Sequence, residues 1–357
     1  MRRRDLLGAI PALAGARSAI GGTGAPPLGR GINITGWFRF PSSRDPAALR
    51  TWLSDAALGD LRRVGFDFVR LAVDPALLED DTIRAVFLSS VRRMQEAGLT
   101  VVVSPHPSGW QLESNPRDRT RLERFWTVMA SALRPLDPAR TVPEILNEPV
   151  FPHDPATWQA LQRGLLAIIR QSLPDRTVML TGHDWGSITG LLGLQPEADR
   201  HVVYSVHFYD PVELTALAAY RPGLDRHALA RLPFPDTGTP ACRQAADGAV
   251  DEGTRELMRY FCSLGWDRQR VDQSIGRAAA WARQHQAKVV MGEFGASEQL
   301  NQPSRLAWLR AVRGACEEQG LGWALWGYDD VMGFGLSRPP PSRPVLDPAL
   351  LNALGLA

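Results

Sequence analysis

The stretch Phe-Asp-Phe-Val-Arg-Leu-Ala-Val at residues 66–73 is almost continuously apolar, and its later half carries one basic residue, Arg70. Two further stretches share this pattern: TVVVSPH at 100–106 carries His106, and KVVMGEFGA at 288–296 carries Glu293. Apolar runs without polar alternation are typical of parallel strands that are covered on both faces. The sequence therefore predicts a parallel sheet that is buried between helices.

Eight short runs rich in strand-forming residues recur along the chain, each bounded by Gly, Pro or Asp. They lie at residues 29–36, 66–73, 100–106, 141–149, 177–185, 201–211, 288–296 and 322–330. Segments with helical periodicity separate them: Ile83, Val86 and Phe87 begin one apolar stripe, and Asp154 before Pro155 indicates the start of another helix. Eight strand–helix units predict an α/β fold, a closed (β/α)8 TIM barrel. The alternative is an open doubly wound sheet, which the lack of a Gly-rich phosphate loop after the first strand disfavours.

The 357 residues fit one barrel domain over residues 25–357, with one long excursion after the sixth strand. The excursion covers residues 211–271 and has helical patterns at 213–220 and 252–264. Because it follows the carboxyl end of a strand, we expect it to form a wall of the barrel mouth and not a second domain.

Composition excludes several classes of protein. The formal net charge is +2, which disfavours nucleic acid as the partner. The mean hydropathy is −0.17. The sequence contains no run of 18 uninterrupted apolar residues, which argues against a membrane-spanning protein.

The N-terminus has the pattern of an export signal of the twin-arginine type. Arg2-Arg3-Arg4-Asp5-Leu6-Leu7 precedes a short, weakly apolar segment, and Ala14-Gly15-Ala16 offers a small-residue cleavage site. We expect residues 1–24 to be a leader, and the protein to be exported to the periplasm or beyond, without a permanent membrane anchor. A basic, frayed terminus is the alternative.

The three cysteines fit either an oxidising or a reducing compartment. Cys316 lies on a helical face with Leu309 and Val312, so we expect a buried thiol. Cys242 and Cys262 lie close together in the excursion, and either a disulfide or two free thiols agrees with their spacing.

Polar residues gather where the predicted strands end. They are Arg70, His106, Asn147, Glu148, His207, Tyr209, Glu293 and Trp326. Ionisable groups at the ends of apolar strands are costly to bury unless they face one shared polar site, and in a closed barrel those ends converge. Glu148 and Glu293 then face each other, as the two carboxylates of a glycoside hydrolase do. The sequence lacks the motifs of zinc proteases, serine hydrolases and nucleotide-binding proteins.

This set of residues, with Asn147-Glu148-Pro149 ending the fourth strand and Gly292-Glu293-Phe294-Gly295 ending the seventh, resembles glycoside hydrolase family 5, the cellulase family. The resemblance covers nearly the whole chain after the leader. It implies that Glu293 is the nucleophile and Glu148 the acid/base of a retaining double displacement. It also implies supporting roles. Asn147 would bind the sugar 2-hydroxyl; Arg70 and Tyr209 would steady Glu293; His106 and His207 would contact sugar hydroxyls or the acid/base; Trp326 would floor the subsite of the cleaved sugar.

Sugars stack their C–H faces on aromatic rings, so tryptophans at the mouth are candidate substrate contacts. Trp37, Trp110, Trp185 and Trp266 follow strand ends or lie in predicted mouth loops. The tryptophans placed on helices are expected to pack in the core.

The expected substrate is a polysaccharide or oligosaccharide, the expected activity is endo-β-1,4-glucanase, and the chain is expected to act as a monomer without cofactor or metal. The same chemistry on mannan, β-1,3-glucan, xyloglucan or a bacterial exopolysaccharide is the first alternative, and the action is then endo or exo. A non-catalytic carbohydrate-binding barrel is the second.

Overall fold

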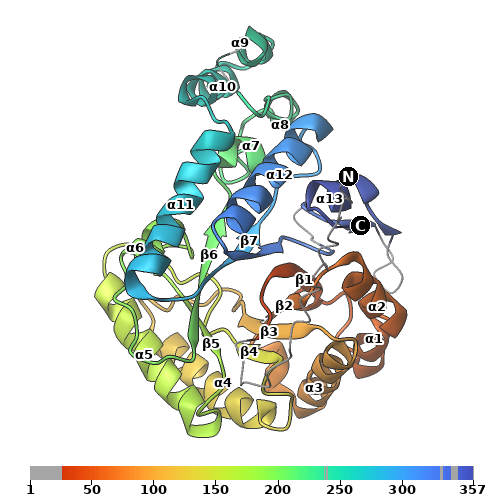
Figure 1. Cartoon of the computed structure of the whole chain (residues 1–357), viewed down its shortest axis with the longest axis vertical. Helices are drawn as coiled ribbons and strands as arrows, with labels where there is room; N and C mark the ends of the chain where they lie inside the picture. The colour runs from red at the N-terminus through yellow and green to blue at the C-terminus, as the bar shows by residue number, and fades with distance from the viewer. Residues whose placement is uncertain (1–25, 237, 239, 330–332, 339–344, 357) are drawn as a thin grey trace, which may run out of the picture.

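The computed structural model describes residues 26–236, 238, 240–329, 333–338 and 345–356, so the predicted leader lies outside the described residues. Eight parallel strands form the centre of the molecule (Figure 1). They are β1 (Arg30–Phe38), β2 (Phe68–Val73), β3 (Thr100–Pro105), β4 (Thr141–Pro143), β5 (Val178–Thr181), β6 (Val202–Phe208), β7 (Val289–Phe294) and β8 (Gly322–Leu325). Each lies within or overlaps one of the eight predicted runs, which confirms the strand predictions.

The sheet closes into a barrel. Its strand order is β4-β3-β2-β1-β8-β7-β6-β5, and β1 pairs with both β2 and β8. A parallel bridge between Glu144 and Met179 joins the remaining edges, and the Ile145 amide donates to the Met179 carbonyl at 3.0 Å. The closed (β/α)8 barrel is therefore confirmed over the open sheet.

Helices surround the barrel. They include α1 (Pro46–Thr51), α2 (Asp55–Val64), α3 (Asp81–Glu96), α4 (Pro116–Leu133), α5 (Pro155–Ser172), α6 (Ile188–Leu192), α11 (Arg268–His285), α12 (Gln302–Glu318) and α13 (Pro348–Ala353), with a 3-10 turn η1 (Leu77–Glu79). A short hairpin, β9 (Ser337–Arg338) with β10 (Val345–Leu346), precedes α13. The predicted cap of α5 is present: the Asp154 carboxylate accepts from the Thr157 amide at 3.0 Å, and Pro155 is the first helical residue.

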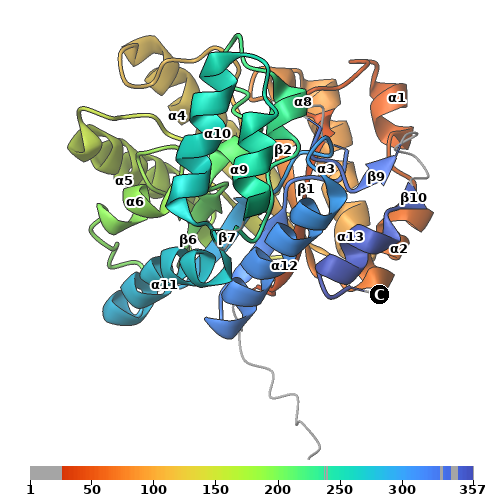
Figure 2. The ribbon, with the colours of Figure 1, turned by 90° about the horizontal axis from the view of Figure 1, so that it is seen from above.

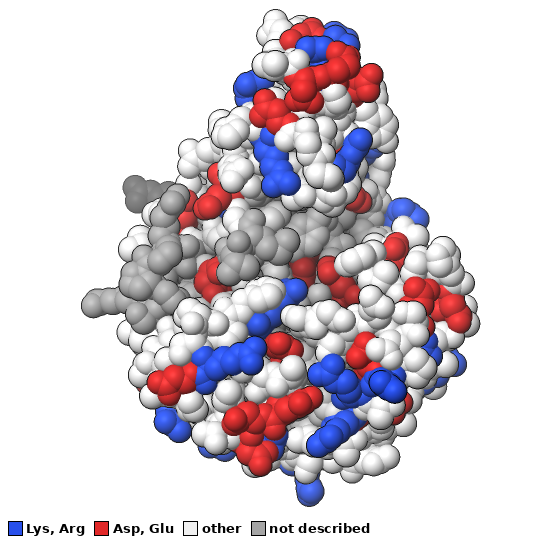
Figure 3. Space-filling model, turned by 180° about the vertical axis from the view of Figure 1, so that it is seen from behind, with Lys and Arg blue, Asp and Glu red and all other residues white. Residues whose placement is uncertain are grey.

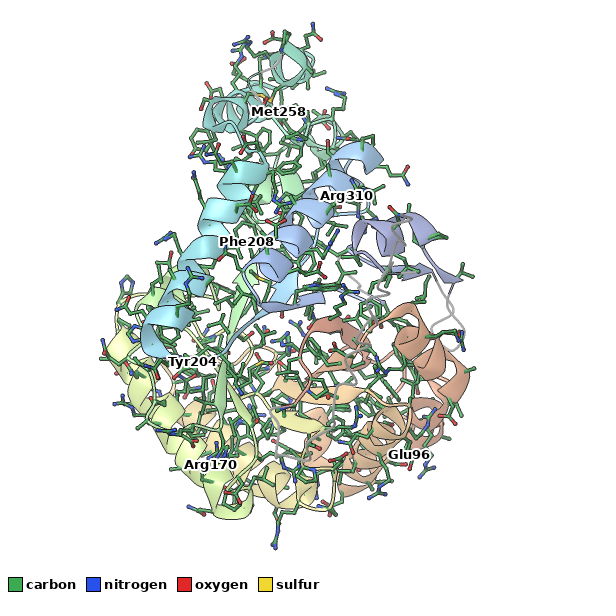
Figure 4. The ribbon with its side chains drawn as sticks, in the orientation of Figure 1. Glu96, Arg170, Tyr204, Phe208, Met258 and Arg310 are labelled. Atoms are coloured by element: carbon green, nitrogen blue, oxygen red, sulfur yellow. A yellow bond between two sulfur atoms is a disulfide. The ribbon has the colours of Figure 1, made fainter. Side chains whose placement is uncertain are left out.

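Side chains alternate across each strand and so divide the barrel into an outer and an inner face. On β6, Tyr204 and Phe208 point outward and pack on Trp281 of α11 and Trp308 of α12, with ring centroids 5.0 and 6.1 Å apart (Figure 4). Residues of the other parity face the interior. The amino-terminal ends of seven strands contribute one apolar layer there: Phe68, Val102, Val142, Met179, Val203, Val290 and Ala324.

A polar layer lies two residues further along several of these strands, because inward-facing positions recur with a period of two. It contains Arg70, Ser104, Glu144, Thr181 and Ser205, all fully buried. The barrel interior is thus apolar at one end and polar toward the mouth. Gly31 on β1 makes room for the apolar layer, since a Cβ atom there would lie 2.2 Å from the Phe68 ring.

The excursion after β6 forms a lobe beside the barrel. It holds α7 (Val212–Thr215), α8 (Arg226–Leu229), α9 (Pro240–Asp247) and α10 (Glu252–Leu264). The helix predicted at 252–264 is confirmed, whereas the one predicted at 213–220 is only the single turn of α7. Figure 1 shows α9 and α10 projecting beyond the ring of helices, where Figure 4 places Met258, and they stand near the viewer in Figure 2.

A disulfide joins Cys242 of α9 to Cys262 of α10, with their Cα atoms 5.7 Å apart. The disulfide alternative is therefore the correct one for this pair. Cys316 is a buried free thiol, as predicted, and burial raises its pKa. Among the described residues no helix is long and apolar enough to span a membrane.

Candidate active site

A cleft of about 460 Å³ opens at the carboxyl ends of the strands. Its lining comes from the loops after β1, β3, β4 and β5: Arg39, His106, Pro107, Trp110, Gln111, Leu112, Glu113, Ser114, Leu146, Asn147, Glu148, Pro149, Val150 and Trp185. Figure 3 shows this face, which is hollowed between the lobe and the body of the barrel and exposes both acidic and basic side chains there. Polar strand ends therefore converge on one mouth, as the sequence predicts.

Arg70 is the centre of a buried hydrogen-bond network below the cleft. Its Nε and Nη2 donate to Oε2 and Oε1 of Glu144 at 2.6 and 3.0 Å. Its Nη1 donates to Oδ1 of Asn33 at 2.9 Å and to Oε1 of Glu293 at 2.6 Å. Nη2 also donates to Oδ1 of Asn147 at 2.7 Å. All five N–H donors of the guanidinium are thus used, which fixes its position.

The charge of Arg70 is stabilised although its side chain is fully buried. Burial acts to lower the pKa of Arg70, but the charges and hydrogen bonds of Glu144 and Glu293 outweigh burial and raise the pKa above its usual value. The guanidinium is therefore positively charged in the site.

Glu148 and Glu293 lie side by side, with one oxygen of each and a nitrogen of His207 all within 4.8 Å of one another. Glu293 is buried, with its side chain 4% exposed, and its second oxygen accepts from the Tyr209 hydroxyl at 2.9 Å. Glu148 is more open, with its side chain 27% exposed, and its oxygen is 2.9 Å from Nδ1 of His207. The two carboxyl groups therefore have different surroundings. Glu293 accepts hydrogen bonds from a charged guanidinium and a hydroxyl, whereas Glu148 lies next to an imidazole and solvent.

His106 lines the cleft, and Trp326 is buried beside it, outside the cleft lining. Their rings are stacked, with centroids 6.0 Å apart, and Nε2 of His106 is 3.0 Å from the Ser104 hydroxyl. Burial, followed by the positive charges of Arg39 and Arg70 and by His207, holds the pKa of His106 well below its usual value. His106 is thus a neutral imidazole in the folded protein.

The four tryptophans predicted to contact substrate do not lie together. Trp110 and Trp185 line the cleft. Trp185 is 58% exposed and has a left-handed backbone, with φ of 51°, which is uncommon for a bulky residue. Its amide donates to the carbonyl of Pro149 at 3.1 Å, which ties it to the residue after Glu148.

The prediction for Trp37 is wrong. Trp37 is fully buried, its ring stacks between Phe38 and Trp52, and its Nε1 donates to the Leu49 carbonyl at 2.8 Å. The pairing of β1 with β2 shifts register between Ile34 and Phe38, and the strand turns Trp37 into the core beneath α1. Trp266 also lies outside the cleft lining. It is half-buried at the start of α11 beneath the Arg270 guanidinium.

The predicted wall of the cleft also differs from the structure. No described residue of the excursion lines the cleft. The longest helices of the excursion, α9 and α10, instead pack on each other across the disulfide and project from the barrel.

Sequence reasoning missed three polar residues of the site: Asn33, Arg39 and Glu144. Asn33 holds the carbonyls of Gly292 and Leu325 through Nδ2, so it ties β1 to the strand that carries Glu293. Glu144 interrupts an apolar strand and faces the same interior layer as Arg70. This shared inward-facing position along the strands is the sequence signal that could have identified Glu144.

Two groupings among the described residues bring three potential metal-ligand atoms together. One is Glu148, His207 and Glu293; the other pairs Asp236 with Cys242 and Cys262, whose sulfurs are bonded to each other. In the first grouping both oxygens of Glu293 already accept hydrogen bonds from Arg70 and Tyr209. The oxygens of Glu293 are thus engaged by donors of the protein itself.

A (β/α)8 barrel with two adjacent carboxyl groups at its mouth, one held by an arginine and one open to solvent, has the architecture of a glycoside hydrolase. The comparison of sequences agrees. The family described as Cellulase (glycosyl hydrolase family 5) matches residues 33–330, and the chain belongs to this family.

Curated relatives are distant. Endoglucanase 3 of Fibrobacter succinogenes is 23% identical over 84% of this chain, which spans about half, 49%, of that protein. Endoglucanase C of Acetivibrio thermocellus is 23% identical over 89% of this chain and 96% of its own length. Among solved structures, Thermotoga maritima Cel5A in complex with mannotriose has a TM-score of 0.73 and 21% identity, covering 92% of this chain and 97% of its own. That similarity concerns the fold.

Proposed function

We propose that this protein is a retaining endo-β-1,4-glucanase in which Glu293 is the nucleophile and Glu148 the acid/base. The observation that carries the proposal is the close pair of carboxyl groups with unlike surroundings. Retaining enzymes hold their two carboxyl groups about 5 Å apart, whereas inverting enzymes leave room for a water between them.

Glu293 suits the role of nucleophile because its partners hold it in place. Arg70 and Tyr209 donate to its two oxygens at 2.6 and 2.9 Å, which fixes the carboxyl group at the mouth of the barrel. One oxygen attacks the anomeric carbon and forms a glycosyl ester, while the bond from that carbon to the departing sugar oxygen breaks.

Glu148 suits the role of acid/base because it lies at the open side of the pair, next to His207. It gives its proton to the departing sugar oxygen. It then takes a proton from the water that attacks the same carbon and releases Glu293. Two inversions at one carbon leave the product with the configuration of the substrate.

Asn147 is placed to read the sugar beside the nucleophile. Arg70 donates to its carbonyl oxygen, so its amide nitrogen is the end directed to a partner other than Arg70. A donor at this point can bind the 2-hydroxyl of the reacting sugar, a contact that strengthens in the transition state. Trp326 and His106 form the floor under the same sugar.

Trp185 belongs to the leaving-group side of the cleft. Its backbone is tied to Pro149, which follows the acid/base, and the acid/base protonates the departing sugar. A largely exposed indole at that point offers the flat apolar face on which a sugar stacks.

Substitution Trp185→Ala is expected to raise KM for a long glucan about fivefold and to leave kcat within about twofold, since a stacking contact is worth ~1 kcal/mol. An aryl glycoside that occupies only the glycone side should be hydrolysed as by the wild type. Tyr260→Ala removes an equally exposed aromatic ring from the lobe and is the matched control. Unchanged KM on the polymer in Trp185→Ala would remove this tryptophan from the substrate path.

Endo action is supported by the shape of the mouth. The described lining runs from Arg39 after β1 to Trp185 after β5, and no described residue of the lobe closes it. A polysaccharide chain can therefore lie across the cleft with sugars on both sides of the catalytic pair. The relatives named endoglucanases agree with this reading.

The choice of glycan rests on loops that vary within a fold, so it is the part of the proposal that an activity panel must test. Carboxymethylcellulose, mannan, β-1,3-glucan, xyloglucan and bacterial exopolysaccharide are compared, with products sized over time. We expect rapid fragmentation of the β-1,4-glucan. Release of a single small product from chain ends would replace endo with exo action, and hydrolysis confined to mannan would change the substrate.

The proposal has two further parts: the protein is exported, and it acts on its glycan as a monomer. The disulfide supports an oxidising compartment, and one chain supplies both catalytic carboxyl groups. Binding of oligosaccharide without any product would favour the non-catalytic barrel.

A further inference from the structure

We propose that Glu144 is a positioning residue of the reaction: it holds Arg70 in the orientation that serves both the nucleophile and Asn147, and it balances the charge of that arginine. The inference rests on the proposed roles of Glu293 and Glu148. It concerns a residue that faces away from substrate, in the polar layer beneath the cleft.

The first support is the geometry of the pair. Glu144 is fully buried and accepts two parallel hydrogen bonds from Arg70, at 2.6 and 3.0 Å. Such a fork fixes the plane of a guanidinium as well as its position. The donors that remain then point in set directions, two of them to Glu293 and Asn147 at 2.6 and 2.7 Å.

The second support is the place of Glu144 in the barrel. Its backbone forms the bridge to Met179 that joins β4 to β5, and four residues later the same segment supplies Glu148. Glu144 therefore links the closure of the barrel to the catalytic end of the same segment. A carboxylate anchored at this point has little freedom to follow Arg70 if the arginine moves.

The third support is the balance of buried charge. Arg70 contacts two carboxylates at 2.6 Å, Glu144 and Glu293, and all three side chains are at most 4% exposed. The negative charge of Glu144 compensates the positive charge of Arg70. Glu293 therefore receives its hydrogen bond from an arginine whose charge is already partly balanced. A nucleophile stabilised by a full, unshared charge is a weaker nucleophile and a better leaving group.

The other groups that face this cluster are few. His207, from β6, is 3.5 Å from Glu293, and Tyr209 donates to Glu293. Glu148 follows β4 and pairs with His207. His106, from β3, feels the charge of Arg70 but is neutral. Glu144 and Glu293 are thus the carboxylates within hydrogen-bonding distance of Arg70 among the described residues.

The test compares Glu144→Gln, Glu144→Asp and the wild type on an aryl β-cellobioside with a dinitrophenolate leaving group. In Glu144→Gln we expect kcat/KM to fall at least tenfold, and the acidic limb of its pH profile to move to lower pH. The pre-steady-state burst should shrink, because attack by Glu293 slows while its release does not. Glu144→Asp keeps the charge, so the acidic limb of its pH profile should stay where it is while kcat/KM falls.

Glu317→Gln is the matched control. Glu317 also pairs with two arginines, Arg30 at 3.0 Å and Arg313 at 2.8 Å, but on the opposite end of the barrel. The Glu317→Gln variant should have a lower Tm and an unchanged pH profile of kcat/KM. If Glu144→Gln fails to fold, Glu144→Asp carries the test, and wild-type kcat/KM in that variant overturns the inference.

The outcomes separate the inference from the function on which it rests. Suppose that the wild type is active and that folded Glu144→Gln shows a full burst and the wild-type acidic limb in its pH profile. This result overturns the positioning role alone. A wild type that does not turn over the glycoside overturns the proposed function and this inference with it.

Discussion

Substitution Glu293→Gln should reduce kcat on cello-oligosaccharides by about 10⁴-fold or more, because an amide oxygen is too weak a nucleophile to attack the anomeric carbon. The amide is similar in size to the carboxylate and can still accept a hydrogen bond from Arg70 or Tyr209, which donate to the native side chain at 2.6 and 2.9 Å. We therefore expect a folded protein that binds substrate but does not turn it over. Initial rates, circular dichroism and ligand binding measure the three properties.

Removal of the Glu293 carboxyl group gives sharper evidence that Glu293 is the nucleophile. In Glu293→Ala, azide can occupy the space of the lost carboxylate and attack the anomeric carbon of an activated β-glycoside. A single inversion then yields the α-glycosyl azide. Formation of the β-azide, or Glu293→Gln with wild-type kcat, would show that Glu293 is not the nucleophile.

Substitution Glu148→Gln should have an effect that depends on the leaving group. For a cello-oligosaccharide the departing alkoxide needs a proton, so kcat/KM should fall about 10³-fold, within the range for loss of a general acid. A dinitrophenolate leaves without a proton, so kcat/KM for that glycoside should fall much less. Steady-state kinetics on the two substrates measure the difference, and Glu293→Gln is the control that should be inactive on both.

Azide again separates the roles. With Glu148→Ala the glycosyl ester on Glu293 forms from the activated substrate and then waits for a base. Azide needs none, so it should accelerate turnover and give the β-azide. An equal loss on both leaving groups would contradict the assignment of Glu148 as acid/base.

Most of the fold is predictable from the sequence because eight buried parallel strands leave eight apolar runs. The ends of elements were less predictable. The run at 141–149 reads as one strand, yet the regular strand β4 covers only Thr141–Pro143, and a single bridge at Glu144 follows it. The excursion was harder still, since its short helices α8 and α9 are held by contacts within the lobe and not by a long apolar stripe.

The convergence of the polar strand ends was predictable for a general reason: closing a parallel barrel brings the carboxyl ends of all strands to one mouth. Arg70, Glu148, His207 and Glu293 meet there as expected. Their individual hydrogen bonds could not be predicted, because these depend on a few tenths of an ångström in register.

The tryptophans show where the argument from position fails. Trp37 and Trp185 both lie at the end of a strand predicted from the sequence, yet one is fully buried and the other is 58% exposed. The register shift in β1 turns Trp37 inward, and the left-handed backbone at residue 185 turns the other outward. Neither feature has a clear signal in a single sequence.

The configuration of the first product tests the central claim most directly. Proton NMR during hydrolysis of cellopentaose by the wild-type protein should show the β-anomer first, with the α-anomer appearing only by mutarotation, since oxygens of Glu293 and Glu148 lie within 4.8 Å of each other, a spacing typical of retaining enzymes. First appearance of the α-anomer would contradict the double displacement at this pair of carboxyl groups.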